Sequence, residues 1–298
     1  MSAGPASPGS TLVASRGAGR VMRIATGILL IVWFALPFLP LVLWAGADRW
    51  SFPSPLPTEW GTRGLLAAEG FGALPAFLTS AVLAVTVAAI ATPLGALAAR
   101  ALTFGSVPWP RAVAALLLSP IALPPFAAVL GVNVVLLRTY VPPVAGTVLV
   151  LVVLALPYTA FVMRTAYGAY DMSYEENARL LGASRRDVLL RVQVPLLAPA
   201  LARAAFLAFL VAWSDYLVTV IVGAGELVTL PLVVAGAAAA VGNDAAVAVM
   251  SLAAILPPIV LLLATVSLGR RRAAPAAAST STPATAPTAA STPERIPA

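Results

Sequence analysis

Three residue types are missing from this 298-residue chain: it has no cysteine, no histidine and no lysine, so all 18 basic residues are arginine. Without cysteine or histidine, thiolate and imidazole metal sites and a Ser-His-Asp triad are excluded. Without lysine no phosphate-binding P-loop can form, because that loop places its lysine on the nucleotide phosphates. We therefore expect no ATP hydrolysis by the usual route, no catalytic residues, no metal site and no cofactor.

Charge is also scarce, since only 10% of the residues are charged and 60% are hydrophobic. A water-soluble domain usually carries about 25% charged residues, so much of this surface must face a lipid bilayer. The net charge is +7. Because the arginines lie at the ends of apolar runs, we interpret this charge as fixing orientation in a membrane and predict no nucleic acid partner.

Long apolar runs fill most of the chain, and a membrane-spanning helix needs about 20 apolar residues. The runs are continuous, which indicates helices and not the short alternating strands of a barrel. The sequence therefore predicts an all-α integral membrane protein with six transmembrane helices. The runs cover residues 24–46, 71–99, 112–137, 139–163, 204–225 and 245–269, of which the fifth is interrupted by Asp215.

The distribution of arginine predicts the orientation of these spans in the cell membrane. With the N-terminus inside, only Arg49, Arg63 and Arg138 lie outside, and the other 15 of the 18 arginines are cytoplasmic. Positive charge gathers on the cytoplasmic side of multi-pass membrane proteins. We therefore expect both termini in the cytoplasm.

The two ends of the chain differ in composition from the middle. Residues 1–20 and 273–298 are rich in Ala, Ser, Thr and Pro, which predicts disordered cytoplasmic tails around a transmembrane domain at 21–272. Residues 45–47 have the small-x-small form of a signal-peptide cleavage site, which leaves cleavage of the first span open. The apolar run before it exceeds the 7–15 residues of a secretory core, so we expect the span to be retained.

The longest cytoplasmic connection, residues 169–197, lies between the fourth and fifth spans and carries two helix signals. Ser173 followed by Glu176 predicts a capping box at the start of a short amphipathic helix. Gly182 predicts its end, because glycine readily adopts the left-handed conformation of a helix C-cap.

A second short helix is predicted after this turn. Ser184 followed by Asp187 can begin it, and Pro195 is expected to end it. The result is two short helices with a sharp turn between them, exposed to the cytosol. The alternative is an amphipathic loop lying on lipid, although lipid binding demands no fixed Gly or Pro position.

The spacing in this segment resembles the cytoplasmic signature of the permease subunits of binding-protein-dependent ABC importers with the type I fold. That signature reads Glu-Ala-Ala, three residues, Gly, nine residues, Ile, one residue, Leu-Pro. Every spacing fits, with Asn177, Val192 and Val194 as the departures in residue type. The matching positions are Glu176, Asn177, Ala178, Gly182, Val192, Val194 and Pro195.

The resemblance implies that this segment forms coupling helices, which seat in a groove of a separate ATP-binding ATPase subunit. Leu181 is added to the signature positions as a further coupling residue. Closure of the ATPase then tilts the bundle between inward-open and outward-open states. It also implies a second homologous permease subunit, in a heterodimer more often than a homodimer, and an extracytoplasmic substrate-binding protein.

A second group of candidate residues lies around the interruption in the fifth span: Trp213, Ser214, Asp215 and Tyr216. A carboxylate within a span is costly and marks a functional site by default, so we predict that these residues line the translocation pathway. Packing or gating by Asp215 is the alternative.

This stretch resembles the second permease of spermidine/putrescine importers. An anion in low dielectric also favours a cationic guest, so a polyamine substrate is predicted. Related permeases leave iron, phosphonate, sulfate or another anion as alternatives. A transporter driven by an ion gradient is the competing function, although that class usually needs carboxylates or polar helix breaks on several spans.

Overall fold

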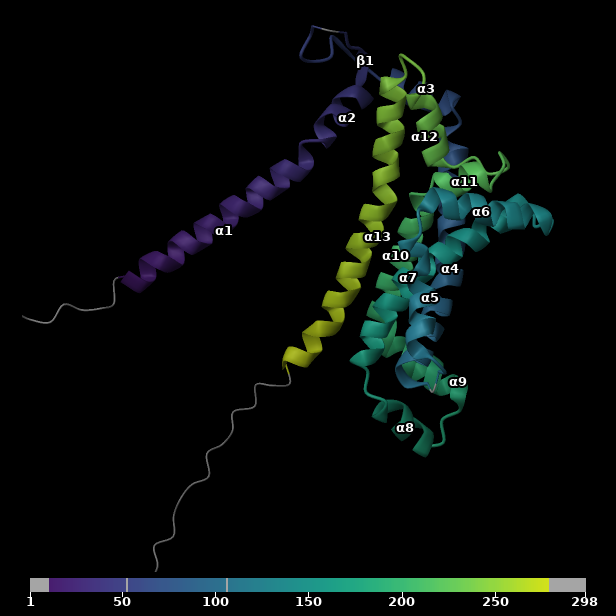
Figure 1. The fold of residues 1–298 in the computed structure, drawn as a ribbon. Helices are drawn as coiled ribbons and strands as arrows, with labels where there is room; N and C mark the ends of the chain where they lie inside the picture. Colours follow the sequence, from purple (N-terminus) through teal and green to yellow (C-terminus); the bar gives the residue numbers. More distant parts are fainter. Residues whose placement is uncertain (1–10, 52, 106, 279–298) are drawn as a thin grey trace, which may run out of the picture.

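The structure is a computed structural model that describes residues 11–51, 53–105 and 107–278, and side chains only between residues 20 and 267. Almost all of the described chain is helical (Figure 1). The elements are α1 (Thr11–Ala35), α2 (Phe38–Ala45), β1 (Ala47–Arg49), β2 (Glu59–Trp60), α3 (Arg63–Gly70), α4 (Ala73–Phe104), α5 (Pro110–Ala122), α6 (Pro125–Arg138), α7 (Pro143–Gly168), α8 (Ser173–Leu180), α9 (Arg185–Asp187), the π-helix η1 (Val188–Gln193), α10 (Val194–Trp213), α11 (Leu217–Ile221), α12 (Leu230–Ala238) and α13 (Asp244–Ala278).

Four stretches of helix are long and apolar enough to cross a membrane: Ala73–Phe104, Pro143–Gly168, Arg185–Trp213 and Asp244–Ser267. Two further candidates are pairs of helices with a sharp bend between them, α1 with α2 and α5 with α6. The multi-pass helical architecture predicted from the sequence is thus confirmed. Six complete spans remain a prediction, because they require each bent pair to count as one.

The first pair bends by 49° between α1 and α2. Figure 1 shows α1 leaning away from the rest of the bundle, and its large apolar side chains, such as Trp33 and Phe34, are exposed. Helix α1 begins at Thr11 and α13 continues to Ala278. Helical structure therefore extends into both predicted tails, whose remaining residues, 1–10 and 279–298, lie outside the described ranges.

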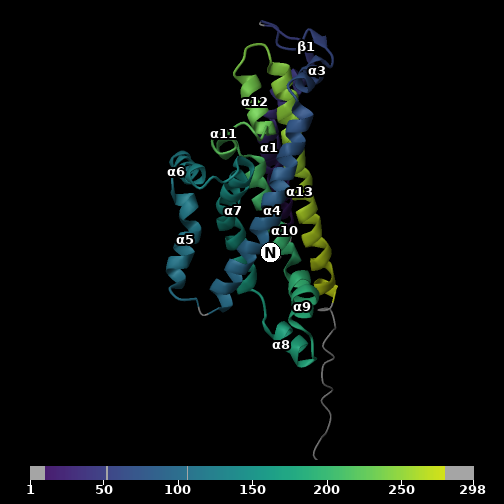
Figure 2. The ribbon, with the colours of Figure 1, turned by 90° about the vertical axis from the view of Figure 1, so that its right-hand side faces the viewer.

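The third predicted span, residues 112–137, is not one straight helix. It bends by 106° between α5 and α6: Figure 2 shows α5 running along the bundle, and Figure 1 shows α6 running across it. The cause is local: Leu123 is extended, with φ −83° and ψ 143°. A residue that precedes proline is disfavoured in the helical conformation, and here Pro124 and Pro125 follow in succession.

The fifth predicted span, residues 204–225, is placed wrongly. The helical stretch runs from Arg185 to Trp213. Pro195 does not end the second short helix, since it lies in the first turn of α10. The wider π-helical turn of η1 precedes it, and such a turn accommodates the proline ring without breaking the helix.

Helices α4, α7 and α10 form the centre of the bundle, and α4 and α7 pack closely at Gly95. A Cβ atom built on Gly95 would lie 2.0 Å from Thr159 Oγ1 and 3.0 Å from the Ala160 nitrogen. The Thr159 hydroxyl is fully buried and donates to the Ala91 carbonyl oxygen at 3.2 Å. Only glycine therefore allows the two backbones to approach this closely.

The end of the bundle opposite α8 carries the short antiparallel pair β1 and β2, followed by α3 (Figure 1). Arg49 and Glu59 form an exposed ion pair here, with Nη1 and Oε1 3.1 Å apart. The backbone nitrogen of Leu230, at the start of α12, donates to the buried hydroxyl of Ser80 on α4 at 2.8 Å. This hydrogen bond ties α12 to the central helices.

Candidate functional site

The segment predicted to carry the function, residues 169–197, lies at one end of the molecule, and we call it the projecting segment. Helices α8 and α9 extend beyond the ends of α4, α7 and α10, and both views show them at the same end (Figures 1 and 2). The predicted short first helix exists as α8. The predicted second helix begins at α9 but continues into α10, so it is the start of a long helix and not a separate element.

Helix α8 begins differently from the capping box that the sequence predicts. The helix begins at Ser173, so the residue at its N-cap is Met172, which makes no side-chain capping hydrogen bond. Instead, the backbone nitrogen of Ser173 donates to Asp171 Oδ1 at 2.9 Å, and this hydrogen bond lowers the pKa of the Asp171 carboxyl. The Glu176 side chain is exposed and therefore free to meet a partner.

The end of α8 confirms the predicted glycine turn. Gly182 has φ +84°, its nitrogen donates to the Arg179 oxygen at 2.9 Å, and the Ala183 nitrogen donates to the Ala178 oxygen at 3.0 Å. These two bonds define a Schellman motif, which requires a left-handed residue at this position. The motif leaves Leu180 and Leu181 85% and 88% exposed, so two large apolar side chains project from the turn.

The start of α9 also agrees with the prediction made from the sequence. The Ser184 hydroxyl accepts a hydrogen bond from the Asp187 backbone nitrogen at 3.2 Å and donates to Asp187 Oδ2 at 2.5 Å. This is an N-cap with an acidic side chain in the first helical turn, where the helix dipole favours it.

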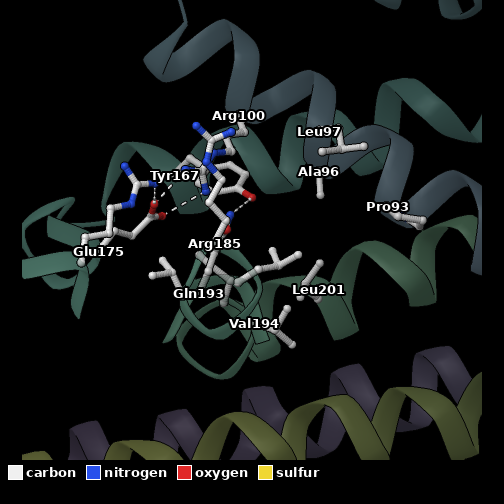
Figure 3. Close-up of a pocket in the computed structure, with 14 residues that line it drawn as sticks. Pro93, Ala96, Leu97, Arg100, Tyr167, Glu175, Arg185, Gln193, Val194 and Leu201 are labelled. Atoms are coloured by element: carbon white, nitrogen blue, oxygen red, sulfur yellow. Dashed lines mark hydrogen bonds and ion pairs between the residues drawn. The ribbon is translucent and has the colours of Figure 1, made fainter. Parts of the chain in front are cut away.

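An ion pair that sequence reasoning missed holds α8 against the bundle. Glu175 is only 1% exposed, and its carboxylate accepts two hydrogen bonds from Arg100 at the end of α4, at 2.8 and 3.0 Å (Figure 3). Arg179 lies 3.6 Å from the same carboxylate. A bidentate pair is the strong form of this interaction, and it fixes orientation as well as distance.

Two tyrosines, one in the last turn of α7 and one just beyond it, complete the cluster. Tyr167 is buried, and its hydroxyl accepts a hydrogen bond from Gln193 Nε2 of η1 at 2.7 Å. Burial raises the pKa of the Tyr170 hydroxyl to about 12, and the nearby Glu175 carboxylate adds to the shift. The cluster therefore joins α4, α7, α8 and η1 at the point where the projecting segment leaves the bundle.

The predicted coupling residues mostly lie on the surface of this segment. Ala178 and Val192 are half-buried, and the others are exposed: Glu176, Asn177, Leu181, Gly182, Val194 and Pro195. They could thus contact another subunit, whereas Arg100, Glu175, Tyr167 and Gln193 face inward. One signal in the sequence points to the missed glutamate, since Glu175 is an acidic residue of an amphipathic helix with Arg179 four positions later.

The second predicted group surrounds the end of α10. Trp213 is buried, stacks on Phe209 with ring centroids 5.5 Å apart, and meets the edge of Phe77 at 5.2 Å. Its indole nitrogen donates to the Ala254 oxygen at 2.9 Å. These contacts join α10 to α4 and α13, so Trp213 is a packing residue in this structure. Ser214 and Tyr216 are exposed.

The predicted span places Asp215 within one continuous helix. In the structure Asp215 lies instead in the break between α10 and α11. Its carboxylate accepts hydrogen bonds from the backbone nitrogens of Val218 at 3.2 Å and Thr219 at 2.9 Å, and from the Thr219 hydroxyl at 2.9 Å. A carboxylate at a helix N-terminus satisfies donors that otherwise lack partners. In the described ranges, no group of three or more acidic side chains could hold a metal ion.

Comparison with protein families gives one match that covers more than half of the chain. The model described as "Binding-protein-dependent transport system inner membrane component" matches residues 91–273, which include the whole projecting segment and the break at Asp215.

Two relatives come from Streptomyces. A putative ABC transporter permease protein, ORF1 of Streptomyces antibioticus, is 32% identical over 48% of this chain and 62% of its own length. The diacetylchitobiose uptake system permease protein NgcG of Streptomyces coelicolor is 27% identical over 64% of this chain and 66% of its own length. The match thus spans less than two thirds of each relative.

Among solved structures, the crystal structure of a bacterial ABC transporter involved in the import of the acidic polysaccharide alginate has a similar chain. The TM-score is 0.60 at 16% identity, over 89% of this chain and 99% of that chain. At this identity the likeness concerns the fold alone.

Proposed function

This chain belongs to the family of inner membrane components of binding-protein-dependent transport systems, and on that premise we propose that it forms one half of the translocation pathway of an ATP-driven importer. The family is a transport component and not an enzyme. Family membership also favours ATP-driven import over a transporter driven by an ion gradient. The ATPase, a second permease and a substrate-binding protein are the partners that this role requires.

The observation that carries the proposal is the geometry of the projecting segment. Its turn presents Leu180 and Leu181 almost fully to solvent, while Glu175 on the same helix is held by Arg100. Exposed leucines on a rigid turn are typical of a surface that is covered by a partner. We propose that this end of the bundle faces the cytosol and that the turn inserts into the ATPase subunit.

The ion pair explains how movement of α8 could reach the membrane. A force on α8 acts through Glu175 on Arg100, and Arg100 belongs to α4, which packs directly on α7 around Gly95. The same stretch of chain continues through α9 into α10 without a break. Displacement of the projecting segment therefore acts on two central helices at once.

Co-purification with the ATPase tests this role. Leu181→Asp should remove the ATPase subunit from the complex, because it places a charge in the apolar contact. The matched control is Leu66→Asp on α3, since Leu66 is also exposed but lies near the opposite end of the bundle. Retention of the ATPase by the Leu181 variant at the level of the control would overturn the assigned docking surface.

For the substrate, we propose a neutral or weakly charged sugar in place of the predicted polyamine. The physical argument for a cationic substrate is the charge of Asp215, but three hydrogen bonds at the start of α11 already satisfy that carboxylate. The relative with a named substrate class takes up diacetylchitobiose. The exposed residues beside the break, Ser214 and Tyr216, offer a hydroxyl and an aromatic face, which suit a sugar better than a polyamine.

Uptake measurements distinguish the two substrate classes. A strain that lacks this chain but keeps its partners should lose uptake of a labelled oligosaccharide such as diacetylchitobiose and keep uptake of putrescine. The wild-type chain should restore the loss, and Tyr216→Ala should restore it only in part. Loss of putrescine uptake with normal uptake of diacetylchitobiose and other oligosaccharides would overturn the sugar proposal and return Asp215 to the pathway.

A further inference from the structure

A cavity of about 600 Å³ lies between α4 and the start of α10, and α8 and α9 close one end of it. Its walls are mainly apolar. Pro93 and Leu97 come from α4, and Leu197 and Leu201 come from α10. At the closed end the lining changes to charged residues, and Figure 3 shows Arg100 and Glu175 there, away from Pro93.

The charged residues at this end of the cavity carry a net positive charge. Three arginines, Arg100, Arg179 and Arg185, line the cavity together with one carboxylate, that of Glu175. Arg100 binds both oxygens of that carboxylate, and Arg179 approaches it at 3.6 Å. Arg185 forms no hydrogen bond or ion pair through its side chain with any residue that the structure describes. The cavity therefore combines apolar walls with an unpaired guanidinium at one end.

We propose that this cavity binds one anionic phospholipid, with its phosphodiester against Arg185 and Arg179 and an acyl chain along Leu97 and Leu201. A guanidinium matches a phosphate in geometry and charge. Basic pockets between helices at the membrane surface suit anionic headgroups. Leu97 is 64% exposed, so the cavity is open along the side of α4 that a bilayer would cover.

A small soluble anion fits this cavity less well than a lipid. The polar lining residues lie together at one end (Figure 3), and the apolar remainder of the wall offers no hydrogen bond to a phosphorylated metabolite. Filling the rest of the cavity with an acyl chain removes apolar surface from water, which a free anion cannot do. The lipid would contact α4, α8 and α10, the helices through which the projecting segment acts on the bundle. This inference does not depend on the identity of the transported substrate.

Native mass spectrometry of the delipidated full-length chain tests the proposal. Phosphatidylglycerol should bind at least about tenfold more tightly than phosphatidylcholine of the same chain length. Arg185→Gln should weaken phosphatidylglycerol binding about fivefold, which corresponds to about 1 kcal/mol for one arginine at a charged membrane surface. Arg185→Lys should retain more of the binding than Arg185→Gln, because the charge is kept while the planar geometry of the guanidinium is lost.

Arg186→Gln is the matched control, since Arg186 is the neighbouring exposed arginine and does not line the cavity. It should leave binding unchanged. Equal binding of the two lipids, or an equal loss in both Gln variants, would overturn the site. Displacement of phosphatidylglycerol by millimolar glycerol phosphate would overturn the lipid as the occupant and favour a soluble anion.

Discussion

Substitution of Arg100 by glutamine should release α8 from the bundle while the bundle itself stays folded. Arg100 supplies both hydrogen bonds that hold the Glu175 carboxylate, and Glu175 is 1% exposed. After the substitution the carboxylate keeps the more distant Arg179, at 3.6 Å, and the neighbouring Tyr170 hydroxyl. A buried carboxylate with so weak a partner is more stable in water, so the helix that carries it should detach.

The free-energy cost of each substitution depends on which partner of the ion pair is left buried. Removing one partner of a buried ion pair costs about 3–5 kcal/mol, because the remaining charge is left without compensation. Glu175→Gln should cost less, about 1–3 kcal/mol, because the Arg100 side chain is 28% exposed and can reach water. The double variant should cost less than the sum of the single variants, since two amides can still form a hydrogen bond.

Hydrogen exchange of the α8 amides measures this release directly, because it reports local opening. A cost of about 3 kcal/mol corresponds to roughly a hundredfold loss of protection. In the reconstituted complex, the same variant should hydrolyse ATP without stimulation by loaded binding protein, because the ATPase then moves α8 without moving α4. Arg49→Gln is the control: its pair with Glu59 is exposed and should contribute less than about 1 kcal/mol.

Two outcomes contradict this reasoning. If Arg100→Gln changes neither exchange in α8 nor stimulation of ATP hydrolysis, the ion pair does not hold the segment. If exchange rises throughout α4 and α7 as well, the substitution unfolds the bundle, and the proposed local link is wrong.

Three further predictions rest on the same structure. Gly182→Ala should destabilise the turn by about 1 kcal/mol, because the residue has a left-handed backbone conformation, with open space around it. It should reduce affinity for the ATPase more than it reduces the stability of the bundle, and an unchanged affinity would contradict this. Gly95→Ala should lower the thermal midpoint, at a cost of about 1–3 kcal/mol from the clash with Thr159, and a midpoint equal to wild type refutes the close packing. A membrane-impermeant thiol reagent on intact cells should label Ser51→Cys and not Ser184→Cys, and the reverse pattern would invert the proposed orientation.

Local features of the chain were predictable from the sequence because their causes are local. Apolar runs of sufficient length identify helices, and the predicted glycine turn at Gly182 is present with its two backbone hydrogen bonds. The N-cap at Ser184 is likewise confirmed. Each of these depends on a few consecutive residues, so spacing and residue type are enough.

The breaks in the spans and the central ion pair depend on more than local sequence. Arg100 and Glu175 are 75 positions apart, so their contact requires the packing of α4 against the start of the projecting segment. Pro195 predicts a helix end, but the π-helical turn before it lets the helix continue. The apolar run around Asp215 predicts a charge inside a span, but the chain breaks there and the carboxylate accepts hydrogen bonds from the start of α11.

These differences bear on how transport and ATP hydrolysis could be linked. A segment that transmits force needs one rigid connection and one surface for the partner. Here the rigid connection is ionic and inward, at Glu175, while the partner surface is apolar and outward, at Leu180 and Leu181. Both features belong to α8 and the turn that ends it, and the two faces differ because Glu175 and Leu180 lie five positions apart and thus on different sides of the helix. Substitutions on the outward face should therefore alter docking alone, and those on the inward face should alter transmission after docking, so the Leu181 and Arg100 variants separate the two steps.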